Sequence, residues 1–140
     1  MLKPITGFLI LAASLALTPA AAADDAWPDL TGEWAGTSES VVRGDPLHHE
    51  GGETPHLSEV AFTLKIEGQE GRRFWGVLVS PNDSEPVVGV IANDRQSIYL
   101  VDLDGYAVDT LIDDNTLEHC YLQANANVQV AACVDFTRQP

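Results

Sequence analysis

Residues 96–112, QSIYLVDLDGYAVDTLI, decide how this chain folds, because two short apolar runs flank the pair Asp104-Gly105. An Asp-Gly pair between such runs is a strong local signal for a β-hairpin, since both residues tolerate the positive φ of a tight turn. The pattern therefore predicts two antiparallel strands, over residues 96–103 and 106–112.

Side chains alternate between the two faces of a strand, so the hairpin turn sets which of them share a face. A two-residue turn places Asp102 and Asp109 together on the solvent face, and a longer turn would invert part of this assignment. The opposite face is then expected to point inward, and it carries Tyr99, Val101, Leu103, Tyr106, Val108, Thr110 and Ile112.

The same alternation continues on both sides of this hairpin. Residues 59–67 alternate apolar and polar positions with period two rather than the 3.6 of a helix. Segments rich in Gly, Pro, Asn and Asp separate the runs that follow. We count eight strands in all and no convincing helix; the remaining strands are expected at residues 31–43, 59–67, 72–79, 85–92, 115–124 and 127–137.

The connections after Ile66 are short, which favours pairing between strands that follow one another in the chain. Eight such strands close most simply into an all-β, antiparallel up-and-down (meander) barrel, because closure removes exposed sheet edges. A two-sheet sandwich would need longer crossover connections. We therefore predict an eight-stranded barrel.

The two cysteines lie on the last predicted hairpin. A turn centred between Ala126 and Asn127 puts Cys120 directly opposite Cys133. Directly opposed residues in a non-hydrogen-bonded antiparallel pair lie about 4.5 Å apart at Cα, at the short end of disulfide geometry. We predict a cross-strand disulfide that faces outward. The same register places His119, Tyr121 and Gln123 on the inward face.

The first 23 residues have the features of a signal peptide. Lys3 precedes an apolar stretch over residues 5–17, and four alanines ending at Ala23 provide a small-residue cleavage pattern. The apolar stretch is shorter than the roughly 20 residues of a membrane-spanning helix. We expect a single domain over residues 24–140, periplasmic or secreted and without a membrane anchor, in an oxidising compartment that favours the disulfide.

The chain is strongly acidic. Its 140 residues include 21 Asp and Glu against 7 Lys and Arg, for a formal charge of −14. Removal of the first 23 residues would leave 117 and take away one lysine, which makes the charge −15. Such a chain offers no basic surface for a nucleic-acid backbone or an anionic membrane, so neither is expected as a partner.

The start of the first predicted strand, Leu30-Thr31-Gly32-Glu33-Trp34, resembles the G-x-W signature of the calycin superfamily, which includes lipocalins, avidins and fatty-acid-binding proteins. The resemblance implies that a basic residue at the end of the last strand packs over Trp34 and plugs one end of the barrel. Arg138 has the position that this role requires. The chain is similar to a small exported bacterial barrel of this type, with no specific family assigned, and the tryptophans of the avidin biotin site are absent.

Polar side chains on the expected inward faces suggest a binding site at the barrel mouth. A few convergent polar groups among aliphatic side chains are typical of a small-molecule pocket. The alternative is an interior filled by its own side chains, as small barrels allow. The candidate ligand-binding residues are Tyr99, Tyr106, Thr110, His119, Tyr121 and Gln123.

The long connection over residues 44–57 is a second candidate site. It holds His48, His49, Glu50 and His56, and imidazoles with carboxylates suit divalent zinc, copper or nickel. The alternative is a solvated acidic turn with incidental histidines. No other cofactor is expected.

No nucleophile with an adjacent base stands out in the sequence, so no catalytic residues are expected and the protein is taken as non-enzymatic. The leading hypothesis is binding of a small, largely apolar ligand at the barrel mouth. The alternatives are a protein-interaction or inhibitor module, in which the long loop and acidic surface meet a basic exported partner, and metal binding through the histidine loop.

Overall fold

The computed structural model describes residues 26–140, so the predicted signal peptide and its cleavage site lie outside the described residues. Within that range no helix is long and apolar enough to cross a membrane. The strands are β1 (Gly32–Gly44), β2 (Gly52–Ser58), β3 (Ala61–Glu70), β4 (Arg73–Val79), β5 (Ser84–Ile91), β6 (Ser97–Val101), β7 (Tyr106–Asp113), β8 (Thr116–Ala124) and β9 (Gln129–Arg138).

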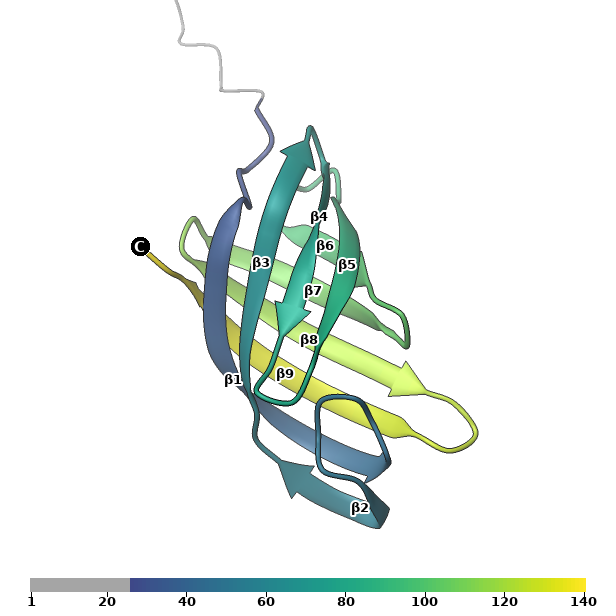
Figure 1. The fold of residues 1–140 in the computed structure, drawn as a ribbon. Helices are drawn as coiled ribbons and strands as arrows, with labels where there is room; N and C mark the ends of the chain where they lie inside the picture. The colour runs from purple at the N-terminus through teal and green to yellow at the C-terminus, as the bar shows by residue number, and fades with distance from the viewer. Residues whose placement is uncertain (1–25) are drawn as a thin grey trace, which may run out of the picture.

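Eight of these strands form a closed antiparallel barrel, as the sequence predicts. Strands β3 to β9 pair with one another in chain order, β1 pairs with β3, and β1 also pairs with β9 to close the sheet (Figure 1). Side chains from all eight strands fill the interior. The barrel is therefore of the up-and-down type.

The ninth strand, β2, corrects the prediction that residues 44–57 form a loop throughout. β1 is 13 residues long, and its first half, from Gly32 to Thr37, pairs with β3. The second half extends beyond β3 and would leave a free edge there. β2 covers that edge with a register that runs from Ser40 opposite Ser58 to Gly44 opposite Gly52 (Figure 1).

One end of the barrel is plugged in the manner that the calycin resemblance implies. Trp34 is fully buried, and its indole Nε1 donates a hydrogen bond to the Leu30 carbonyl at 2.9 Å. The guanidinium carbon of Arg138 lies 4.1 Å from the centre of the Trp34 ring. The same guanidinium donates to the carbonyls of Asp29, Thr31 and Asp114 at 2.7, 2.7 and 2.9 Å. We call this end the closed end.

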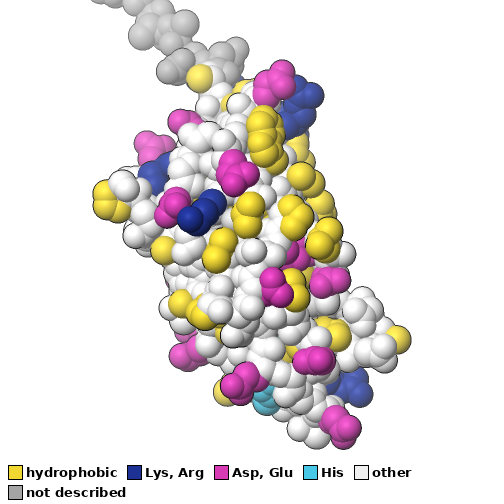
Figure 2. All heavy atoms as spheres, in the orientation of Figure 1, with side chains coloured by type: hydrophobic (Ala, Val, Ile, Leu, Met, Phe, Trp, Pro, Cys, Tyr) yellow, Lys and Arg dark blue, Asp and Glu magenta, His cyan; other side chains and the backbone are white. Residues whose placement is uncertain are grey.

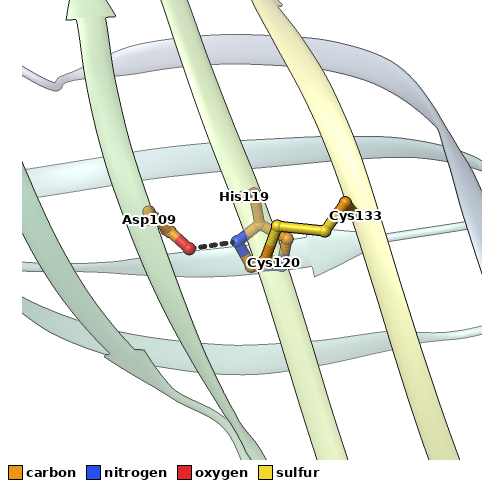
Figure 3. The surroundings of a disulfide bond; sticks show 4 residues. All are labelled: Asp109, His119, Cys120 and Cys133. Atoms are coloured by element: carbon orange, nitrogen blue, oxygen red, sulfur yellow. Dashed lines mark ion pairs between the residues drawn. A yellow bond between two sulfur atoms is a disulfide. The ribbon is translucent and has the colours of Figure 1, made fainter.

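The last hairpin has the predicted register. Cys120 pairs with Cys133 in the β8–β9 ladder, and the two form a disulfide with a Cα–Cα distance of 4.1 Å. The neighbouring His119 points to the other side of β8, into the barrel, where it is buried (Figure 3). The disulfide lies on the outer face, as expected.

The inward face predicted for β6 and β7 is wrong. Tyr99 and Tyr106 are about half exposed, at 51% and 50%, and Thr110 shares their outward face. The residues that point inward are Ile98, Leu100, Ala107, Asp109 and Leu111. Both faces of these strands are apolar, so hydrophobicity alone does not distinguish them, and Asp109 is buried because it has an internal partner.

The turn between β6 and β7 is longer than the predicted two residues. Val101 pairs with Tyr106, which leaves a four-residue turn. The Asp102 carboxylate caps this turn by accepting hydrogen bonds from the backbone N–H groups of Asp104 and Gly105 at 2.9 and 2.7 Å. Asp102 is thereby held at the end of the barrel opposite the Trp34 plug.

Candidate functional site

The loop over residues 45–51 covers the second end of the barrel, which we call the mouth (Figure 1). β1 ends at Gly44, whose φ of 93° turns the chain, and the loop returns to β2 at Gly52. Between them, His48 and His49 are buried at 7% and 9% exposure. Histidine side chains from a connecting loop thus occupy the mouth.

His48 joins this loop to the barrel wall. Its Nδ1 lies 2.8 Å from the Ser80 hydroxyl and its Nε2 lies 2.8 Å from Glu85 Oε1. The ring also makes an edge contact with Phe62, at 5.3 Å between centroids. The His48 carbonyl accepts a hydrogen bond of 2.8 Å from the Asn82 side chain. These contacts hold the loop to the β4–β5 turn.

A small cavity lies beneath the loop, where the two clusters of the apolar core meet against Tyr121. Its volume is about 30 Å³. Since a water molecule needs roughly 10–15 Å³ on this measure, the closed mouth has space for about two waters. The side chains around it are Pro46, Leu47, His48, His49, Phe62, Leu78, Glu85, Asp102, Asp104, His119, Tyr121, Gln123, Val130, Ala132 and Val134.

Glu85 is the most unusual of these lining residues. It is only 4% exposed, and one carboxylate oxygen is bound to His48. The other oxygen, Oε2, is buried with no hydrogen-bond partner among the described residues. A buried polar atom without a partner is energetically costly, and this oxygen of Glu85 is an unused hydrogen-bond acceptor.

Tyr121 brings a neutral hydroxyl to the same cavity. Its hydroxyl donates to Asp102 Oδ1 at 3.3 Å. Burial, followed by the charge of Asp102, raises the pKa of Tyr121 far above its ordinary value. The phenol therefore stays protonated at every physiological pH and acts as a hydrogen-bond donor.

A buried contact between a carboxylate and an imidazole connects β7 and β8 deeper in the barrel. Asp109 and His119 face each other in the register, and Asp109 Oδ1 lies 2.9 Å from His119 Nδ1 (Figure 3). The two atoms are at ion-pair distance without the angles of a hydrogen bond, so both Asp109 oxygens lack a hydrogen-bond partner among residues 26–140. The His119 ring stacks on Tyr121 at 6.5 Å and packs on Phe136 at 5.5 Å. This pair fixes the imidazole that lines the cavity.

Half of the predicted ligand-binding residues reach this site. His119, Tyr121 and Gln123 line the cavity, whereas Tyr99, Tyr106 and Thr110 lie on the outer face of the barrel. The sequence pattern placed Asp109 on the solvent face and gave no indication that Glu85 belongs to the site. The outward position predicted for Cys120 contained a signal for Asp109. Val108 lies opposite Cys120 and must also point outward, so the next residue, Asp109, points into the barrel.

The four residues proposed to bind a metal do not converge. His48 and His49 point into the mouth, where His49 Nδ1 lies 2.9 Å from the Ser58 hydroxyl. His56 Nε2 instead contacts the backbone carbonyl of Glu50 at 3.0 Å. Over residues 26–140, no three His, Cys, Asp or Glu side chains have an arrangement that could hold a metal ion. The insertion of the loop into the barrel separates the histidines.

The outward side chains of β4 to β8 form an exposed apolar surface. Directly paired positions give one row that crosses all five strands, and a second row lies beside it on β6 and β7. Each side chain is 43–54% exposed, and Figure 2 shows hydrophobic side chains gathered where β4 and β5 lie. This outer apolar face comprises Trp75, Val88, Val101, Tyr106 and Leu122, with Tyr99 and Val108.

Comparisons with known proteins give no match: no protein-family model, no curated protein and no solved structure is significantly similar to this chain.

Proposed function

We propose that this protein is an exported, non-enzymatic binding protein that takes a small, largely apolar ligand at the barrel mouth, beneath the loop over residues 45–51. The observation that carries the proposal is the cavity under this loop, where polar groups converge among apolar side chains. Glu85, His119, Tyr121 and Gln123 supply these polar groups. That combination is characteristic of small-molecule sites.

The ligand requires the loop to move, because the closed cavity has a volume of only about 30 Å³. The loop contributes Pro46, Leu47, His48 and His49 to the lining, so its displacement enlarges the cavity. Side-chain hydrogen bonds of His48, His49 and Asn82 hold it in place. At about 1 kcal/mol each, opening costs a few kcal/mol, which the burial of an apolar ligand offsets at roughly 25 cal/mol per Å².

Export is supported by the disulfide between Cys120 and Cys133 and by the signal-peptide pattern of residues 1–23. Paired cysteines are typical of oxidising compartments. A calycin-like assignment is supported by the closed barrel and by Arg138 over Trp34.

One group of residues at the mouth could be mistaken for catalytic machinery. Ser80, His48 and Glu85 form a chain of hydroxyl, imidazole and carboxylate. Such a chain resembles the relay of a serine hydrolase. The Ser80 oxygen, however, also accepts hydrogen bonds from the backbone N–H groups of Asn82 and Asp83, both at 3.2 Å. Ser80 thus serves as the cap of the β4–β5 turn, and we expect no ester hydrolysis above that of a Ser80→Ala variant.

Native mass spectrometry of the protein purified from its own source tests the ligand proposal. The expected spectrum shows the disulfide-bonded chain with a one-to-one small-molecule adduct that is lost on denaturation. A spectrum of the bare chain alone, together with no binding of an added ten-carbon alcohol, amine or carboxylate, would overturn the proposal.

A second candidate function rests on the outer apolar face. Exposed apolar surfaces of this kind mark interaction sites. Glu118 and Asp135, paired with each other, lie to one side of this face, and Asp102 and Asp104 follow β6 on the other. This acidic border favours a basic exported protein as the partner.

Photo-crosslinking from position 108 in the native source tests this second candidate. The expected product is an adduct with one basic exported protein, and a probe at exposed Ala61 on β3 serves as the control. Adducts only with a second copy of this chain, or none, would rule out a basic partner at this face.

A further inference from the structure

His48 occupies a position that suits a positively charged nitrogen. The Glu85 carboxylate and the Ser80 hydroxyl each lie 2.8 Å from one ring nitrogen, and the Phe62 ring packs against the imidazole. A carboxylate, a hydroxyl and an aromatic ring around one imidazole ring also form a suitable environment for an ammonium group. Because His48 belongs to the loop that must move, its position becomes vacant when the mouth opens.

Glu85 has more acceptor capacity than His48 uses. Glu85 lines the cavity, and its Oε2 is buried without a hydrogen-bond partner among the described residues. When the loop moves away, Oε1 loses the His48 contact as well. Once the hydrocarbon part of a ligand excludes water from the mouth, a carboxylate without a partner is strongly unfavourable, so the site favours a ligand that brings a charged donor.

Apart from its three histidines, the titratable side chains that line the cavity are tyrosine and acidic residues. Asp102 and Asp104 line it together with Glu85, and no lysine or arginine does. Of the six lysines and arginines in residues 26–140, only Arg43 lies on the mouth half, and it donates outside the cavity to the Glu53 carbonyl. The other five contact residues at or near the closed end: Lys65 with Glu33, Arg73 with Glu70, Arg72 and Arg95 with Trp27, and Arg138 with Trp34.

We propose that the mouth selects apolar amines: the protonated amine of the ligand replaces the His48 imidazole against Glu85, and its hydrocarbon part packs on Phe62, Leu78 and Val134. This inference rests on the proposed function and specifies the chemical class of the ligand. The negative potential of the mouth attracts a cation before contact and disfavours fatty acids, whose carboxylate would meet Glu85 directly.

Three ligands with the same ten-carbon tail separate the contribution of the amine to binding affinity from the contribution of the tail. Isothermal titration of the disulfide-bonded chain with decylamine, decanol and decanoate, below their aggregation concentrations, is expected to rank affinity in that order. Decylamine should bind at least roughly tenfold more tightly than decanol, as a charge-assisted hydrogen bond implies. Equal affinity for decylamine and decanol would overturn the amine inference and leave the ligand site standing, whereas failure of all three to bind would overturn the site itself.

The variant Glu85→Gln tests whether the preference for an amine over an alcohol depends on this one carboxylate. It keeps the shape of the side chain and removes its charge, so the preference for decylamine over decanol should fall roughly tenfold. Glu118→Gln, on the outer face, is the matched control for general attraction to an acidic protein. If Glu85→Gln does not fold, Asp102→Asn keeps the turn cap through its amide oxygen and should lower decylamine affinity alone. An unchanged ratio of decylamine to decanol affinity in a folded Glu85→Gln variant would contradict the proposal.

Discussion

His48 Nε2 lies 2.8 Å from Glu85 Oε1, and this contact joins the loop over the mouth to the wall of the barrel. Both side chains are more than nine-tenths buried. This hydrogen-bonded pair is one of the contacts that hold the mouth closed, and its loss would free the carboxylate on which the proposed ligand selection depends.

His48→Ala should loosen the loop and destabilise the fold moderately. The substitution leaves the buried Glu85 carboxylate without its partner, which costs about 1–3 kcal/mol in the free energy of unfolding. Urea denaturation measures this loss, and hydrogen exchange should become faster over residues 45–51. His56→Ala, on β2, is the control and should cost less than about 0.5 kcal/mol. Equal losses of unfolding free energy for the two variants would contradict the claim that the His48 contact holds the loop over the mouth.

Reduction of the Cys120–Cys133 disulfide should lower stability without changing the fold. The bridge closes a loop with a sequence separation of 13 residues, for which the chain-entropy model gives about 3 kcal/mol. Because the sulfur atoms lie on the outer face, the double alanine variant leaves no internal cavity. Guanidinium denaturation of the oxidised and reduced protein provides the measurement, and coincident unfolding curves would contradict the expectation.

Arg138→Lys should destabilise the closed end although it keeps the charge. Lysine lacks the planar fork with which Arg138 lies over Trp34 and donates to three backbone carbonyls. We expect a loss of about 1–3 kcal/mol, seen as a lower denaturation midpoint. Arg73→Lys, whose guanidinium lies on the surface with Glu70, is the matched control and should have almost no effect.

Acidification should weaken the fold in part through His49. Burial, and then the charges of His48 and His56, hold the pKa of His49 below its ordinary value of 6.5. The unfolded chain therefore binds a proton at a pH where the folded chain does not, so the free energy of unfolding falls as the pH drops below about 6.5. His49→Gln should reduce the difference in urea stability between pH 7.5 and pH 5.5. An unchanged difference would show that His49 does not contribute.

The strand pattern and the disulfide were predictable from the sequence because they depend on neighbours along the chain. Alternation located eight strands, and the turn between β8 and β9 set Cys120 opposite Cys133. The inward face of β6 and β7 was not predictable in this way. It depends on β8, since His119 provides the internal partner that allows Asp109 to be buried.

The site was only partly predictable for a similar reason. His119, Tyr121 and Gln123 follow from the register of one hairpin, whereas the pairing of His48 with Glu85 joins residues 37 positions apart. That pairing requires the loop to enter the barrel, which depends on β2 finding the free edge of β1. Neither the entry of the loop into the barrel nor the pairing of β2 with β1 has a signal in the local sequence.

An NMR titration with decylamine tests the ligand site at the mouth most directly. The proposed site predicts saturable shifts in the amides of residues 45–51 and of His119, Tyr121 and Gln123, with none around Trp34 at the closed end. Shifts confined to the outer apolar face, around Val101 and Tyr106, or no saturable shifts at all, would contradict it.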